Sequence, residues 1–412
     1  MGGCGCGGGG MILTGNCLDI LPTLAAESVD SIVTDPPYGL KFMGKSWDHG
    51  IPGAEFWQSA LRVAKPGAYL LAFGGTRTHH RLTCAIEDAG WEIRDCIMWV
   101  YSQGFPKSLD VSKAIDKAAG AERVILGTVK KTHIGGEHSH EAWSRPSHFE
   151  ADGVTPIRKM NLTAPATDAA HQWEGWGTAL KPAWEPIIVA RKPLAGTVAA
   201  NVLQYGTGAM NIDGCRVETE EGGERNHHGA VYEGVAEGYK RQNKSSYTHK
   251  TDWKMQPQGR WPANLIHDGS EEVLALFPQS SGQMADVPLN SRKTKDVYGE
   301  YGHNSGMQAR GDSGSAARFF YCAKASKEDR NEGCDKNTHP TVKPTALMVY
   351  LCRLVTPPGG TVLDMFCGSG STGKAAEKCG FEFIGIDEDP QATEISEKRV
   401  DAARLPLFGE VI

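Results

Sequence analysis

Apolar runs of strand length alternate with helix-like patterns in the first quarter of the chain. The apolar runs cover residues 11–15, 29–34, 68–74 and 93–100, and they are rich in Val, Ile and Leu without regular polar alternation. Helix-like patterns lie at about 54–64 and 76–89. Strands with this uniform apolar character are typically buried on both faces, and their alternation with helices predicts a parallel sheet with crossover helices.

A second block of the same kind lies towards the carboxyl end. Residues 361–366 predict a strand, which a glycine-rich turn connects to a helix ending near Cys379. Another strand is predicted at 383–387 before a final helix, and 186–191 predicts one strand between the two blocks. We therefore predict an α/β, Rossmann-like fold in which the two blocks are halves of one sheet.

Composition narrows the class of protein. A chain of 412 residues is longer than most single cores, so a second region is expected. The net charge of -6 means that any nucleic-acid contact must come from a local basic patch. No apolar run approaches the roughly 20 residues that cross a bilayer, which argues against a membrane role. The 11 cysteines have no paired CxxC spacing, so we expect reduced thiols in a cytoplasmic protein.

The glycine-rich turn at 368–373 has the features of a cofactor site. It follows a predicted strand and opens a helix, so a ligand can approach the backbone at the helix N-terminus. Asp387 ends the next predicted strand, where an acid can bind ribose hydroxyls, and this favours a nucleoside cofactor or, alternatively, a dinucleotide. Asp364 would repel a pyrophosphate and attract a cation. S-adenosylmethionine is cationic and carries no phosphate, so we predict it as the cofactor.

The residues Asp35, Pro36, Pro37 and Tyr38 follow a predicted strand at its carboxyl end, where open α/β sheets bind ligands. The prolines fix the backbone and leave the Pro36 carbonyl as an acceptor. With the Asp35 carboxylate, it can hold both hydrogens of an amino group, while Tyr38 offers a flat face for stacking. This arrangement suits methyl transfer to an exocyclic base amine, which needs neither a metal nor a covalent intermediate.

Basic and aromatic residues are interleaved between 239 and 260. The basic residues are Lys240, Arg241, Lys244, Lys250, Lys254 and Arg260. Cations that contact phosphates and rings that stack on bases are typical of a nucleic-acid surface. A solvated loop with some buried rings is the alternative interpretation. We predict that this stretch contacts double-stranded DNA.

These segments together resemble the DNA amino-methyltransferases, in particular the permuted subgroup in which the Asp-Pro-Pro-Tyr segment precedes the target-recognition region and the cofactor loop comes last. The likeness rests on residues 35–38, on 364–373 and on the segment His-Pro-Thr-Val-Lys-Pro at 339–344. The resemblance implies that the cofactor contacts Asn16, Leu18, Asp35, Lys343, Pro344, Asp364, Phe366, Cys367, Gly368, Ser369, Gly370 and Asp387.

Composition and the predicted elements, together with this resemblance, indicate how the chain is divided. The expected parts are a disordered Gly-rich leader (1–10), a catalytic half (11–127), a flexible insert (128–177), a segment with one sheet strand (178–195), a target-recognition region (196–336) and a cofactor-binding half (337–412). The fold is then a circularly permuted methyltransferase sheet with an inserted target-recognition region.

The residue at position 35 bears on the substrate. Members with Asp there mostly modify adenine, so the resemblance implies adenine N6, with cytosine N4 as the alternative because both amines offer the same hydrogens. A duplex hides both amines, so the target base is expected to flip out and stack on Tyr38. A non-catalytic DNA-binding relative is a further alternative, which an intact Asp35 disfavours. A homodimer and a cognate restriction endonuclease are partners that the sequence leaves open.

Overall fold

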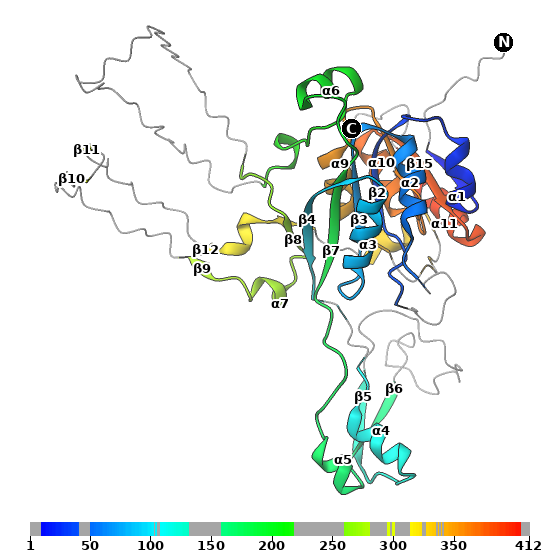
Figure 1. Ribbon diagram of the computed structural model, residues 1–412. Coiled ribbons are helices and arrows are strands. Elements are labelled where there is room, and N and C mark those ends of the chain that lie inside the picture. The colour runs from blue at the N-terminus through cyan, green and yellow to red at the C-terminus, as the bar shows by residue number, and fades with distance from the viewer. Residues whose placement is uncertain are drawn as a thin grey trace, which may run out of the picture.

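A nine-stranded sheet forms the centre of the protein (Figure 1). The computed structural model describes residues 10–40, 50–102, 104, 108–131, 158–217, 259–280, 295–296, 299–300, 314–323, 327–334, 337, 339 and 342–404. In sheet order the strands are β1 (Met11–Thr14), β15 (Glu382–Asp387), β14 (Thr361–Asp364), β2 (Val29–Thr34), β3 (Ala64–Phe73), β7 (Trp184–Arg191), β4 (Glu92–Val100), β8 (Leu265–His267) and β13 (Tyr321–Cys322).

The direction of the strands brings several strand ends to one edge of the sheet. Among the described strands of this sheet, β7 alone runs opposite to the others, because it pairs antiparallel with both β3 and β4. The late strands β14 and β15 lie between β1 and β2. The carboxyl ends of β2 and β14 are therefore adjacent, and β7 begins at that same edge. Both predicted blocks belong to one sheet, which confirms the predicted α/β architecture.

Helices cover both faces of this sheet (Figure 1). They are α1 (Cys17–Ile20), α2 (Ala54–Val63), α3 (His79–Asp88), α9 (Thr345–Val355), α10 (Ser371–Cys379) and α11 (Pro390–Ala403). Along β3, Tyr69, Leu71 and Phe73 pack into a core with α9 and α10, whereas Leu70 and Ala72 pack with α2 and α3. The uniformly apolar strands are thus buried on both faces, as predicted.

The remaining elements lie at the sheet edge or beyond it. Helices α4 (Val111–Ala118) and α5 (Asp168–Gln172) form a small lobe with the paired strands β5 (Ile125–Lys131) and β6 (Arg158–Thr163). Figure 1 shows this lobe apart from the sheet. The other elements are α6 (Val198–Tyr205), α7 (Glu271–Leu274), α8 (Lys327–Asn331), β9 (Gln279–Ser280) with β12 (Gly314–Ser315), and β10 (Lys295–Asp296) with β11 (Gly299–Glu300).

Two of the predicted boundaries between parts of the chain do not coincide with boundaries between structural units. The lobe begins before residue 128 and its paired strands span the predicted border between the catalytic half and the insert. The region predicted for target recognition contributes β8 and β13 to the main sheet. Of the predicted leader, Gly10 alone lies within the described residues, where its N–H donates to Glu377 Oε1 at 3.0 Å.

Several element ends differ from the predicted ones for local reasons. Strand β3 begins at Ala64, four residues before the predicted start at 68, because Ala64 pairs with Val29 and Lys65 forms an ion pair with Asp30 at 2.6 Å. Helix α3 begins at His79, since residues 75–78 form a turn instead. In the described chain, no helix has the length and apolar character needed to span a bilayer. The cysteines there are free, as predicted.

Candidate active site

The two loops that the sequence singled out lie side by side. Strands β2 and β14 are parallel neighbours, and Ile32 lies opposite Leu363. Asp35 directly follows β2, and Asp364 ends β14. The Thr34 hydroxyl donates to Asp364 Oδ1 at 2.6 Å and so connects the two strand ends. A methyl donor bound at the glycine-rich turn would therefore lie next to Asp35.

Asp364 is a buried carboxylate with internal partners. It is 2% exposed and also accepts hydrogen bonds from Thr372 Oγ1 at 2.5 Å and from the Phe366 N–H at 3.1 Å. Burial raises its pKa to about 6, although the hydrogen bonds from Thr34 and Thr372 act in the opposite direction. At neutral pH the group therefore carries a negative charge that is shielded from solvent.

The glycine-rich turn has a backbone conformation that residues other than glycine rarely adopt. Gly368 and Gly370 have φ of +53° and +75°, in the left-handed region that favours glycine. A Cβ at Gly370 would clash with Ser396 Oγ and lie 2.9 Å from Ser396 Cα. The Gly368 N–H donates to Asp387 Oδ2 at 2.7 Å. The turn is thereby fixed against α11 on one side and β15 on the other.

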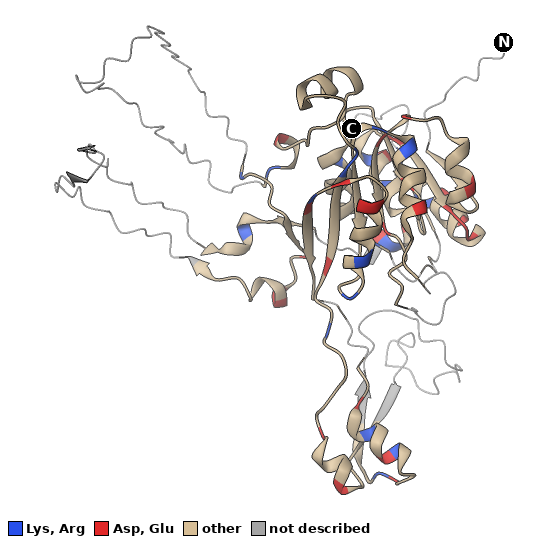
Figure 2. Cartoon of the chain, viewed as in Figure 1, with Lys and Arg blue, Asp and Glu red and all other residues tan. Residues whose placement is uncertain are grey.

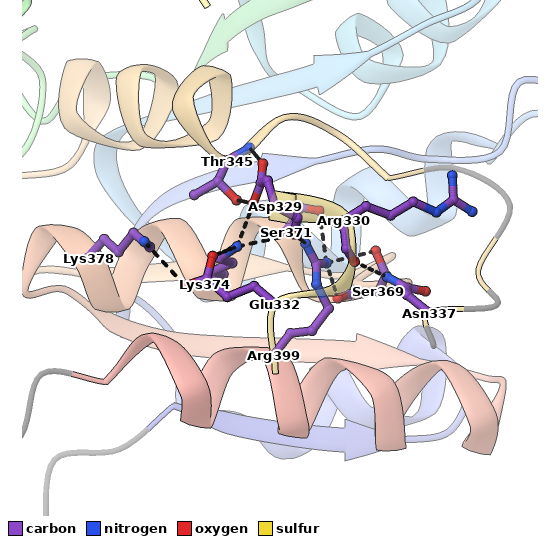
Figure 3. Close-up of polar contacts among 10 residues, drawn as sticks. All are labelled: Asp329, Arg330, Glu332, Asn337, Thr345, Ser369, Ser371, Lys374, Lys378 and Arg399. Atoms are coloured by element: carbon purple, nitrogen blue, oxygen red, sulfur yellow. Dashed lines mark hydrogen bonds and ion pairs between the residues drawn. The ribbon is translucent and has the colours of Figure 1, made fainter. Parts of the chain in front are cut away.

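Two buried cations, Arg399 and Lys374, hold the turn from within the fold (Figure 3), and sequence reasoning missed both. Arg399 Nη1 donates to the Ser369 carbonyl oxygen at 2.5 Å and to Ser371 Oγ at 3.2 Å. Lys374 pairs with Asp329 and Glu332. Lys and Arg on helices usually face solvent, so the burial of these two has no clear sequence signal.

Asp329 connects these cations to the segment that precedes α9. Its carboxylate accepts hydrogen bonds from the Thr345 N–H, at 2.7 Å, and from the Thr345 hydroxyl. It thus fixes the start of α9, directly after Lys343 and Pro344. Figure 3 shows Asp329 between Thr345 and Lys374. Asp329 of α8 therefore connects α10, which the glycine-rich turn opens, to the Lys343 segment before α9.

Residues predicted to bind the adenosine end of the cofactor gather at the ends of β1 and β15. Thr14 pairs with Asp387 across these strands, and the Gly15 N–H donates to the Asp387 carbonyl oxygen at 2.8 Å. Asn16 Oδ1 accepts a hydrogen bond from the Leu18 N–H at 2.8 Å and caps α1. Asn16, Leu18 and Asp387 are thus brought together, while their cofactor contacts stay predictions.

The side chains of Phe366 and Cys367 have different surroundings. The Phe366 ring is partly buried, and its centroid lies 6.0 Å from that of Phe56. Cys367 is 5% exposed, and its Sγ lies 3.0 Å from Ser396 Oγ. Burial raises the pKa of this thiol well above its usual value. The Cys367 side chain is therefore a neutral core group, and its predicted cofactor contact stays untested.

A charged network surrounds the catalytic loop. Lys343 Nζ donates to Asp35 Oδ2 at 2.7 Å, and it lies 3.2 Å from both Glu185 Oε2 and the Tyr38 hydroxyl. The Tyr38 hydroxyl lies 2.8 Å from Asp35 Oδ1 and 3.0 Å from Glu185 Oε2. The Thr78 hydroxyl fixes the loop by donating to the Tyr38 carbonyl oxygen at 2.7 Å. Sequence reasoning missed Glu185, which belongs to β7 but precedes the predicted strand.

The Tyr38 hydroxyl and the Lys343 ammonium in this network both stay protonated at neutral pH. Burial raises the pKa of Tyr38 well above its usual value, and Asp35 and Glu185 raise it further. Burial alone would lower the pKa of Lys343, but Asp35 and Glu185 outweigh this effect and raise it to about 12. Tyr38 is therefore neutral and Lys343 is cationic. One ammonium is shared between two carboxylates.

Comparison with a protein-family model shows which family the chain belongs to. The model of the N6_N4_Mtase family of DNA methylases matches residues 29–398, which is most of the chain. The chain belongs to this DNA methylase family. Membership confirms the predicted likeness to DNA amino-methyltransferases at the level of the family, and it confirms S-adenosylmethionine as the cofactor.

Individual relatives match a short stretch of the chain at higher identity or most of the chain at low identity. The type II methyltransferase M2.DpnII of Streptococcus pneumoniae is 42% identical over 64 residues, which cover 16% of this chain and 24% of that protein. The chain thus spans about a quarter of the curated relative. The M1.HpyAVI-SAM complex is 15% identical, with a TM-score of 0.37 over 94% of this chain and 98% of that one. The PvuII DNA methyltransferase (cytosine-N4-specific) is 12% identical, with a TM-score of 0.41 over 98% and 88%.

Of the six residues predicted to contact DNA, Arg260 lies within the described residues. Lys240, Arg241, Lys244, Lys250 and Lys254 lie outside the described residues. The Arg260 guanidinium lies 4.7 Å from the centroid of the Phe319 ring, and Nη1 donates to the Arg318 carbonyl oxygen at 3.1 Å. Figure 2 shows basic and acidic residues interspersed on the elements around the sheet. Arg260 has a structural role in this arrangement, and its DNA contact stays a prediction.

Proposed function

We propose that the chain is a site-specific DNA methyltransferase that transfers a methyl group from S-adenosylmethionine to the exocyclic N6 of adenine. The adjacency of Asp35 and the glycine-rich turn, connected by the hydrogen bond between Thr34 and Asp364, carries this proposal. It supports a reaction in which acceptor and donor bind at neighbouring strand ends. Family membership supports DNA as the substrate, and Asp at position 35 supports adenine.

The residues around the turn fit S-adenosylmethionine. Gly368 and Gly370 carry no Cβ atom, so the cofactor can approach the backbone at the start of α10. In the proposal, Asn16, Leu18 and Asp387 bind the adenosine end, and Phe366 to Gly370 line the middle. Asp364, Lys343 and Pro344 lie towards the methionine end. When it is bound, the cofactor supplies an electrophilic methyl group.

The chain's own residues would prepare the amine for reaction. Asp35 and the Pro36 carbonyl accept its two hydrogens, which concentrates electron density on nitrogen and orients its lone pair. Pro36 is buried, and Pro37 restricts the backbone that follows it. The flipped-out base stacks on Tyr38.

The order of the elements supports the permuted subgroup. Strands β14 and β15 follow all the other strands in sequence, yet they lie between β1 and β2 in the sheet. The Asp35 loop therefore precedes the proposed target-recognition region, and the cofactor turn follows it. Double-stranded DNA is the proposed partner. A homodimer, a partner endonuclease and a cytoplasmic location remain predictions.

Expression in a bacterial host without DNA methylation, followed by modification-sensitive sequencing, tests the function. We expect N6-methyladenine at one short sequence motif. Substituting Asp35→Ala should abolish methylation while leaving S-adenosylmethionine binding intact, because Asp35 acts on the acceptor. The matched control is Asp401→Ala, which removes an exposed carboxylate from α11. Methylation by the Asp35 variant would refute the mechanism, N4-methylcytosine would refute the choice of base, and unmodified DNA would refute the function.

A further inference from the structure

The Lys343 ammonium has three acceptors within reach in this structure. Asp35 Oδ2 lies at 2.7 Å, and Glu185 Oε2 and the Tyr38 hydroxyl each lie at 3.2 Å. The Lys343 side chain is 11% exposed, so water contributes little to its solvation. The rings of Phe73 and Tyr38 also lie near the ammonium, with centroids 4.8 Å and 5.5 Å away.

In the proposed reaction the Asp35 carboxylate has a second partner besides Lys343. Asp35 must accept a hydrogen bond from the target amine, yet its two oxygens already face the Tyr38 hydroxyl and Lys343. An amine that approaches Oδ2 competes with the lysine for that oxygen. A mostly buried ammonium that gave up Asp35 and had no other carboxylate nearby would be strongly destabilised. Lys343 therefore requires another anionic partner when the base binds.

We propose that Glu185 is a positioning residue that retains the Lys343 ammonium when Asp35 accepts the target amine. In the structure Lys343 lies between the two carboxylates, closer to Asp35. On base binding it moves fully to Glu185 and leaves Asp35 to the amine. This exchange rests on the proposed function.

Glu185 is built to stay in place during such an exchange. It lies within β7, opposite Trp99 of β4, so the sheet fixes its backbone. Its other oxygen, Oε1, accepts a hydrogen bond from the Tyr101 hydroxyl at 3.2 Å. Lys343, in contrast, lies two residues before the start of α9 and ends in a flexible four-carbon side chain. The carboxylate is therefore the fixed partner and the ammonium is the mobile one.

Steady-state kinetics of DNA methylation at saturating S-adenosylmethionine test the exchange. Glu185→Gln keeps the shape of the side chain but removes its charge, so Lys343 should stay on Asp35 and kcat/KM for DNA should fall about tenfold or more. S-adenosylmethionine binding, measured by calorimetry, should change less than about twofold. In a Lys343→Met background there is no ammonium to retain, so the same Glu185 substitution should cause no further loss.

A matched control lies on the neighbouring strand β4. Glu92→Gln also neutralises a carboxylate that faces a β7 cation, Arg191 at 2.6 Å, but at the far end of the strand, and it should leave kcat/KM unchanged. Equal losses from Glu185→Gln with and without Lys343 would overturn the exchange. Full activity of the Glu185→Gln variant would also overturn it, as would a loss of S-adenosylmethionine binding as large as the loss of kcat/KM. Absence of transfer by the wild-type protein would instead refute the proposed function and the exchange together.

Discussion

At the scale of single residues, Asp364 shows how burial and charge oppose each other in this site. The folded protein raises the pKa of this carboxyl from 3.8 to about 6. The folded state therefore binds the proton more tightly than the unfolded state does. Its contribution to stability must fall as the pH rises from about 4 to about 6, by up to about 3 kcal/mol.

Asp364→Asn should remove this pH dependence, because the amide does not titrate. We expect the free energy of unfolding of the wild-type protein, relative to that of the variant, to decline between about pH 4 and 6 and then to stay constant. Urea unfolding of both proteins across that range measures the difference. A difference that is independent of pH would contradict the raised pKa.

The positions of several predicted site residues follow from the predicted strand ends, while their roles stay predictions. Asp35, Asp364 and Asp387 each lie at or directly after a strand, and the structure brings their strand ends to one edge of the sheet. Glu185 and Arg399 had no such signal, since the first belongs to an antiparallel strand and the second occupies a helix interior. Their roles depend on tertiary contacts, which a local pattern does not encode.

At the scale of elements, the two ends of α10 offer a matched comparison. Gly370 and Gly380 flank this helix with φ of +75° and +72°. A Cβ at Gly380 would contact nothing within 4 Å, whereas one at Gly370 would clash with Ser396. The first glycine is therefore required by conformation and by packing, and the second by conformation alone.

Substituting each glycine by alanine separates these effects. Gly380→Ala should cost about 1–2 kcal/mol of stability for the left-handed backbone. Gly370→Ala should cost roughly 1–3 kcal/mol more, because α11 must move, and it should also weaken S-adenosylmethionine binding. Chemical denaturation and calorimetry measure both quantities. Equal costs for the two variants would show that the turn tolerates a Cβ.

Strands with long apolar runs were predicted more reliably than the shortest strands. Strands β2, β4 and β15 lie within one residue of their predicted positions because long apolar runs have few alternative structures. Strands β8 and β13 have three and two residues and were missed, since runs that short carry no periodicity. They extend the sheet because β8 pairs with β4, which provides a preformed edge, and β13 in turn pairs with β8.

At the scale of the whole molecule, the lobe of α4, α5, β5 and β6 has its own stabilising centre. Asp116 is 1% exposed and accepts hydrogen bonds from Arg123 Nη1 at 2.6 Å and from the N–H groups of Ala166 and Thr167 at 2.9 and 3.1 Å. These contacts connect segments from both ends of the lobe. The lobe should therefore open as a unit without the sheet.

Hydrogen exchange measured by mass spectrometry tests this independence. Asp116→Asn removes the charge that Arg123 requires, so exchange should accelerate throughout 110–123 and 161–172 and stay unchanged in the main sheet. Asp110→Asn is the control, because Asn also caps a helix and this side chain is about half exposed. Faster exchange in β2 or β3 of the Asp116 variant would contradict independent opening.

The antiparallel direction of β7 has a mechanical consequence. The chain leaves the sheet for the lobe after β4 and returns from it at the start of β7. Tyr101 lies on the outgoing connection and Glu185 lies near the start of the returning strand, and the hydrogen bond between their side chains closes the base of the lobe. The lobe is thus tethered at the carboxylate network itself. Force applied to the lobe would therefore reach the carboxylate network through two connections that meet at the Tyr101–Glu185 contact and where the Tyr101 N–H donates to the Ala183 carbonyl oxygen at 3.0 Å.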